Sequence, residues 1–147
     1  MKRLPCIIVS LLGFASLVPT IGLAHERKEV AGLTVVFGAE PEPAVTGRMQ
    51  NLRWRFRSPE NQEPYADLQD AEVTIRRAGQ EYGPFQARGS RREPGLLQTV
   101  HIFTEAGEYQ VRLKFSKGKS SETHTVDFTF RIRDRRDLEI PSKKVDP

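Results

Sequence analysis

Apolar and polar residues alternate along most of the segment 25–133, with the period of two that marks strands buried on one face. The clearest case is 48–57, where Leu52, Trp54 and Phe56 share one side and arginines share the other. The same alternation predicts further strands at 30–37, 70–77, 82–87, 96–103, 109–115 and 122–133. No helical period competes with this pattern.

Turn-forming residues separate these strands roughly every ten residues. They lie in the segments 38–47, 58–69, 78–79, 88–95, 105–108 and 116–121. About seven short antiparallel strands in a segment of this length predict an all-β, immunoglobulin-like antiparallel β-sandwich. The inward position of Trp54 places it in the core of that sandwich and not on a ligand-stacking surface.

The first residues have the pattern of a secretory signal. Met1, Lys2 and Arg3 form a short basic start, an apolar run follows over 4–23, and the run closes with the small residues Gly22 and Ala24 at the two positions that a signal peptidase requires. We therefore expect a signal peptide at 1–24 that is cleaved near Ala24, a sandwich at 25–133 and a charged flexible tail at 134–147. The predicted location is the periplasm or outside the cell. An apolar run of this length also leaves open a retained membrane anchor.

Charge and cysteine content narrow the function. The 23 Lys and Arg nearly balance the 19 Asp and Glu, and no basic block alternates with aromatic residues, so nucleic acid is not an expected partner. The only cysteine, Cys6, lies within the expected signal, so the sandwich has neither a thiol nor a disulfide. Without a thiol, a Gly-x-Ser-x-Gly turn or a glycine-rich phosphate loop, we expect no enzyme.

Three turn segments carry a family resemblance. They are Glu40-Pro41-Glu42-Pro43 before Gly47, Glu93-Pro94-Gly95 before a strand, and the run from Glu105 through Ala106-Gly107-Glu108-Tyr109 to Val111. In these three segments the chain resembles the exported immunoglobulin-like domains of the YtkA-like and FixH-like family, and the resemblance covers residues 25–133. It departs from the FixH-like proteins if the signal is cut, because no membrane helix is then retained. The resemblance implies an accessory role in the bacterial envelope, sometimes linked to copper handling or oxidase assembly.

Copper binding is one candidate chemistry. A chain that begins at His25 offers an amine and an imidazole nitrogen in one residue, and both suit copper. In this it is similar to CopC-like copper carriers and to oxidative polysaccharide-cleaving enzymes, which complete the ligand set with a further histidine. Here that histidine is His101 or His124. Alternation places His124 on the inward face of its strand and His101 on the side shared by Thr99 and Phe103. The alternative is that all three are ordinary terminal or strand residues.

Arg53, Arg55 and Arg57 form the one basic stripe on the predicted outer face, with Arg76 and Arg112 as candidate extensions. It is either a docking face for an acidic partner or an anionic lipid surface, or a set of cross-strand pairs with Asp70 or Glu72. The sequence as a whole favours an exported, non-enzymatic binding or accessory module that docks an envelope protein. A copper-delivery protein is the alternative, and a purely structural or adhesive module is the third.

Overall fold

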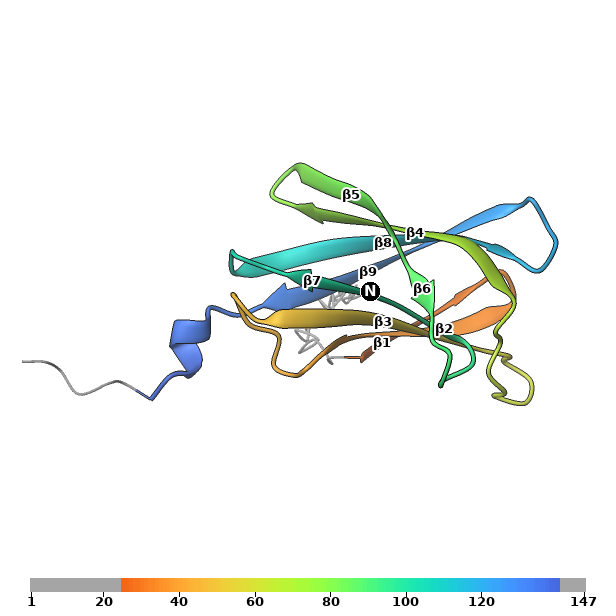
Figure 1. Cartoon of the computed structure of the whole chain (residues 1–147), viewed down its shortest axis with the longest axis horizontal. Coiled ribbons are helices and arrows are strands. Elements are labelled where there is room, and N and C mark those ends of the chain that lie inside the picture. The colour runs from red at the N-terminus through yellow and green to blue at the C-terminus, as the bar shows by residue number, and fades with distance from the viewer. Residues whose placement is uncertain (1–24, 141–147) are drawn as a thin grey trace, which may run out of the picture.

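The computed structural model describes residues 25–140 of the chain. The regular elements of this part are strands and one short 3-10 helix (Figure 1). The elements are β1 (His25–Val30), β2 (Leu33–Glu40), β3 (Met49–Arg57), β4 (Leu68–Arg77), β5 (Gln80–Gln86), β6 (Arg88–Gly89), β7 (Leu96–Ile102), β8 (Gly107–Lys117), β9 (Thr123–Ile132) and η1 (Arg135–Leu138).

The strands form two antiparallel sheets, ordered β1-β2-β3-β7-β6 and β5-β4-β8-β9, which lie as two layers (Figure 1). We refer to them as the first and the second sheet. Apart from β1, the first sheet has the A-B-E-D order of an immunoglobulin domain, and the second has the order C′-C-F-G. The Tyr109 hydroxyl donates to the carbonyl of Glu105 at 2.8 Å, which makes the tyrosine corner of that fold. The predicted all-β antiparallel sandwich is confirmed.

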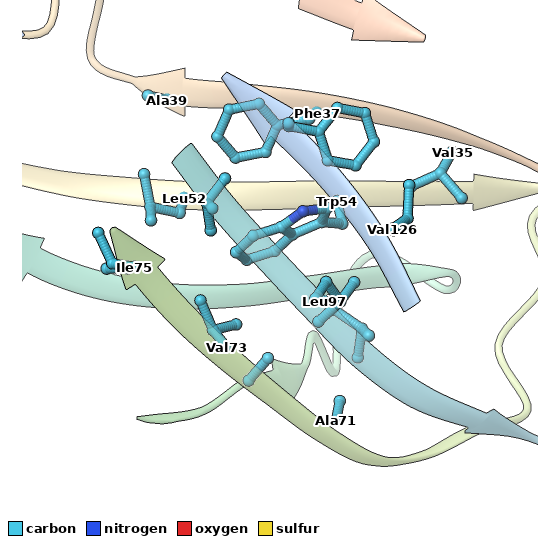
Figure 2. Close-up of a cluster of buried hydrophobic side chains, with 14 of the residues drawn as sticks. Val35, Phe37, Ala39, Leu52, Trp54, Ala71, Val73, Ile75, Leu97 and Val126 are labelled. Carbon is cyan, nitrogen blue, oxygen red and sulfur yellow. The ribbon is translucent and has the colours of Figure 1, made fainter. Parts of the chain in front are cut away.

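The inward face of β3 supplies the centre of the core. Leu52, Trp54 and Phe56 are each at most 1% exposed, and the Trp54 ring lies between the layers beside Leu52 and Phe37 (Figure 2). Phe37 packs on Trp54 with ring centroids 5.3 Å apart and on Phe128 of the second sheet at 5.2 Å. Aromatic packing across the two layers therefore holds together a domain whose described residues include no cysteine.

Two strands of the structure, β1 and β6, were not predicted. The sequence of β1 is almost entirely charged, so it shows no apolar alternation, and a turn at Ala31 and Gly32, with φ of 52° and 68°, separates it from β2. The strand predicted at 30–37 is therefore wrong at its start. β6 is only two residues long and lies in a segment predicted as a turn. The other six predicted strands correspond to β3, β4, β5, β7, β8 and β9.

Side chains of β1 close one lateral edge of the sandwich, where β1 and β9 are neighbours. Lys28 donates to the backbone carbonyl of Asp127 at 2.6 Å, and Glu26 accepts from the backbone N–H of Thr129 at 3.2 Å. Charged side chains thus occupy backbone groups that would otherwise be free on the edge strand β9. On the opposite side, the short β6 covers only part of β7.

The segment expected to be a flexible tail instead begins with η1. Asp134 caps it by accepting from the backbone N–H of Arg136 at 2.9 Å, and the N–H of Arg135 donates to the Thr46 hydroxyl at 3.0 Å. No helix within residues 25–140 is long and apolar enough to cross a membrane. The predicted signal at 1–24 and the end of the tail at 141–147 lie outside the described residues.

Candidate docking interface

Three arginines project from the outer face of β3. Because successive side chains of a strand point to opposite faces, burial of the intervening apolar residues places Arg53, Arg55 and Arg57 outward, as predicted. Their exposure rises along the strand: the Arg53 side chain is 11% exposed, that of Arg55 is 30% exposed, and Arg57 is exposed. The three therefore differ in how available they are to a partner.

Arg53 is held between two carboxylates from distant parts of the chain. Its Nη1 contacts Glu40 at the end of β2, and its Nη2 donates to both oxygens of Glu93, before β7, at 2.7 and 2.8 Å. Arg55 lies 3.5 Å from Glu40 and 3.9 Å from Glu93. The two arginines and the two glutamates thus form one network in which the charges balance.

The predicted pairing of the stripe with Asp70 or Glu72 is wrong, because both residues belong to β4 in the second sheet. Glu72 pairs with Lys114 there, at 3.2 Å. Arg76 and Arg112, expected to extend the stripe, also lie on the second sheet and do not join it. Alternation assigns a face to each side chain but does not say which strands are neighbours.

The network fixes the charge state of its members. Burial alone would raise the pKa of the Glu40 carboxyl, but hydrogen bonds from Arg53 and Arg55 and their positive charges outweigh it and lower the pKa below the ordinary 4.5. Burial alone would lower the pKa of Arg53, and the carboxylates of Glu40 and Glu93 raise it instead.

On this face, the Arg53 Nε and Asn51 Oδ1 atoms are buried without a hydrogen-bond partner among the described residues.

Next to the network lies a pocket of about 270 Å³ that contains more positive than negative charge. It is lined by Arg55, Phe56, Arg57, Pro64, Arg92, Glu93, Pro94, Gly95 and Leu96. Arg57 donates to the backbone carbonyl of Gln62 at 2.7 Å. Within residues 25–140, neither Arg57 nor Arg92 has an ion-pair partner. The pocket is therefore suited to an anionic group.

The wall of the pocket depends on a close backbone approach at Gly95. Phe56 donates its N–H to the Gly95 carbonyl at 2.8 Å and accepts from the N–H of Tyr65 at 3.0 Å. Gly95 has φ of +75°, and a Cβ there would lie 2.7 Å from the Phe56 carbonyl oxygen. The Ser90 hydroxyl accepts from the backbone N–H of Arg92 at 3.3 Å, which helps to fix that turn.

One further arginine lies in this region. Arg88 of β6 is opposite Gln98, which is opposite Arg53, so the three share one face of the first sheet. We call Arg53, Arg55, Arg57, Arg88 and Arg92 together the arginine face. Sequence reasoning missed Arg88 and Arg92 because β6 was read as a turn. The basic run at 91–92, just before a predicted strand, was the available signal.

The structure does not bring the three histidines together. His101 lies on the core side of β7, with its ring centroid 4.5 Å from that of Phe85 and its Nε2 3.0 Å from the Thr99 hydroxyl. Burial lowers the pKa of His101 below 6.5. His124 lies on β9 in the second sheet, with its ring 5.7 Å from Phe115.

Strand counting gives the separations that matter for a shared copper ion. β1 and β7 are three strands apart, and the backbone of His25 is opposite Gly38, so it lies about 17 Å from that of His101. The contacts between β1 and β9 place His25 about 20 Å from His124. Within residues 25–140, no group of three or more metal-ligating side chains is present. Copper binding by His25 through its own two nitrogens stays a prediction.

No protein-family model matches the chain, and no curated protein or solved structure shows significant similarity to it. The resemblance to the YtkA-like and FixH-like domains therefore stays a prediction.

Proposed function

We propose that the chain is an exported, non-enzymatic binding module whose arginine face docks an acidic surface of a protein partner in the envelope. The observation that carries this proposal is the charge surplus of the pocket. Arg53 and Arg55 are matched by Glu40 and Glu93, whereas Arg57 and Arg92 are not matched among the described residues. Exposed, unpaired arginines beside a concave site are suited to carboxylates, which accept two parallel hydrogen bonds from one guanidinium group.

Export is supported by the basic, apolar and small-residue pattern of residues 1–24. The non-enzymatic part is supported by the sequence of residues 25–147, which has no thiol, nucleophile turn or phosphate loop. A protein partner fits better than a lipid surface because the pocket is small and framed by the rigid residues Pro64 and Pro94. Such a site selects individual carboxylates, whereas a lipid surface needs only a diffuse positive charge.

The test is the binding of a fluorescent Asp- and Glu-rich peptide, followed by anisotropy at several salt concentrations. We expect the double variant Arg57→Ser and Arg92→Ser to bind at least about tenfold more weakly and with a shallower salt dependence. The matched control is Lys119→Ser with Arg131→Ser. It removes the same charge from exposed residues away from the arginine face and should change affinity less than about twofold.

Equal losses in the two double variants would show that only net charge matters and would overturn the proposed site. Vesicles of anionic phospholipid provide a second comparison. If they bind the wild type more tightly than the peptide does, and that binding depends on Arg57 and Arg92, the partner is a lipid surface and the proposed protein partner is wrong.

A further inference from the structure

The edge of β7 is only partly covered. β3 pairs with β7 along its whole length, but on the other side β6 pairs only with Leu97 and Gln98. The segment from Thr99 to Ile102 has no neighbouring strand on that side within the described part of the chain.

The hydrogen-bond parity shows which backbone groups point to the open side. Phe56 of β3 donates its N–H to the carbonyl of Gly95, just before β7, at 2.8 Å. Counting from Gly95, every second residue of β7 therefore directs its backbone N–H and C=O groups to β3. The residues between them point away from β3, and the Leu96 carbonyl indeed accepts from Ser90 on the β6 side at 2.9 Å. By the same alternation, Val100 and Ile102 direct their N–H and C=O groups to the open edge.

The side chains at this edge are apolar and exposed. Val100 is 50% exposed, Ile102 is 60% exposed, and Met49, which is opposite Ile102 on β3, is 62% exposed. No residue of β7 is charged. An uncharged edge with β-branched residues and free backbone groups is a template for strand addition.

The other edges of the described sandwich are protected. β1 consists mostly of charged residues, and the backbone of β9 is occupied by the side chains of Glu26 and Lys28. β5 contains Pro84, and its pairing with β4 is broken by a register shift. Each of these features discourages an added strand. Among the described edges, the contrast therefore points to β7.

We infer that the acidic partner contributes an extended segment that pairs, as an added antiparallel strand, with Thr99–Ile102 of β7. This inference rests on the proposed function and states how the partner is held. The added strand continues the line of β6. It gains main-chain hydrogen bonds from Val100 and Ile102, and it covers apolar surface that the arginine face leaves exposed.

Charge determines which partner fits. An antiparallel strand in line with β6 runs in the same direction as β6, so its carboxyl end arrives at Arg88. Arg88 has no ion-pair partner among the described residues. The partner segment therefore has β-branched residues opposite Val100 and Ile102 and acidic residues at its carboxyl end.

The experiment uses a synthetic peptide in which Thr and Val alternate before a carboxyl-terminal Asp-Glu pair. Binding is followed by anisotropy, and amide exchange at Val100 and Ile102 is followed by NMR on residues 25–147. We expect both amides to exchange fast in the free protein and at least about tenfold more slowly with peptide bound. A peptide with the acidic pair moved to its amino end should bind at least about tenfold more weakly.

N-methylation of the peptide tests the hydrogen bonds without altering the protein. In an added strand, every second N–H group faces β7. One peptide carries N-methyl groups at those positions and so loses these donors, and a second peptide carries them at the intervening positions and keeps them. We expect one methylated peptide to lose at least about tenfold in affinity and the other to bind nearly as well as the parent. On the protein side, Val100→Pro removes the corresponding donor at an exposed edge position.

Three outcomes would overturn strand addition. The first is equal tolerance of both methylation patterns. The second is unchanged exchange at Val100 and Ile102 in the complex. The third is protection that appears without peptide as the protein concentration rises, with doubling of the mass, which would make the occupant a second copy. If the Asp- and Glu-rich peptide still binds through Arg57 and Arg92 in any of these cases, the proposed function stands and only this inference fails.

Discussion

The two outer faces of the sandwich carry similar residues but use them differently. On the second sheet, four basic residues of β4 and β8 each meet an acidic residue, whereas Lys117 donates to the backbone carbonyl of Ala31. The pairs are Arg76–Glu81 at 2.5 Å, Arg77–Glu105, Arg112–Asp127 at 2.7 Å and Lys114–Glu72 at 3.2 Å. On the first sheet, the balanced network around Arg53 adjoins a concave region in which positive charge is left over.

The difference shows that the number of basic residues is a poor guide to a binding face. A paired guanidinium group on an exposed strand contributes little to stability or to the long-range field. Arginines become available to a partner where other charges have already fixed the geometry around them, as Glu40 and Glu93 do for the arginine face. The predictions below test this contrast, from the largest expected effect to the smallest.

Replacing Gly95 by alanine should remove the concavity of the first sheet. The added Cβ would meet the Phe56 carbonyl oxygen at 2.7 Å in a left-handed backbone conformation, so we expect a loss of at least about 2 kcal/mol in the free energy of unfolding. Gly89→Ala is the matched control, because its Cβ meets nothing within 4 Å and should change stability by less than about 0.5 kcal/mol. Urea denaturation measures both, and equal losses would contradict the assigned role of Gly95.

Arg53→Met and Arg112→Met compare the two faces directly. Arg53 is 11% exposed and bonds to two carboxylates, so its loss leaves half-buried charges unmatched and should cost about 1–3 kcal/mol in the free energy of unfolding. The Arg112 side chain is 41% exposed and pairs with Asp127 alone, so we expect a smaller loss. Thermal unfolding of both variants would refute the contrast if Arg112→Met proved the more harmful.

The pKa values of Glu40 and Asp127 should respond to these two variants. Both values are lowered in the folded state, so each carboxylate stabilises the fold above its unfolded value, and the contribution is lost as the pH falls through the folded value. In Arg53→Met the pKa of Glu40 should rise, because burial is then opposed only by the charge and hydrogen bond of Arg55. In Arg112→Met the pKa of Asp127 should rise, because its largest cause, the Arg112 hydrogen bond, is gone.

Carboxyl carbon NMR titration between about pH 2 and 6 measures both values. A pKa of Glu40 that stays low without Arg53 would mean that Arg55 alone sets it. The stability of Arg53→Met should also vary less with pH below about 4.5 than that of the wild type.

The smallest effect is expected at the histidines, which are divided between the sheets. Replacing His101 or His124 by alanine should change the Cu(II) affinity of a chain that begins at His25 by less than about twofold. The strand order and register place the three histidines too far apart to bind the same ion. Titration with and without an extra residue before His25 isolates the terminal amine. A tenfold loss in either alanine variant would contradict the strand register.

Alternation was sufficient to predict the faces of β3, β4, β8 and β9, because burial of one face imposes a period of two on the sequence. It was insufficient for β1, whose side chains lie at an edge and bond to a neighbouring backbone instead of entering the core. The two-residue β6 is too short to show any period.

The arginine face was predicted only in part for a related reason. The outward direction of Arg53, Arg55 and Arg57 follows from the strand alone. Their partners Glu40 and Glu93 are 13 and 40 residues from Arg53 in the chain, and they meet it only because β2 and β7 flank β3. Strand order is a property of the whole fold, and no local pattern encodes it.

The closure of one edge by β1 makes the domain sensitive to proteolysis at its start. A cut after Val30 would release Glu26 and Lys28 and leave unpaired backbone on both β2 and β9. Such exposed strands pair readily with further chains, and repeated pairing produces fibrils. A trimmed chain would keep most of its core and yet become prone to aggregation.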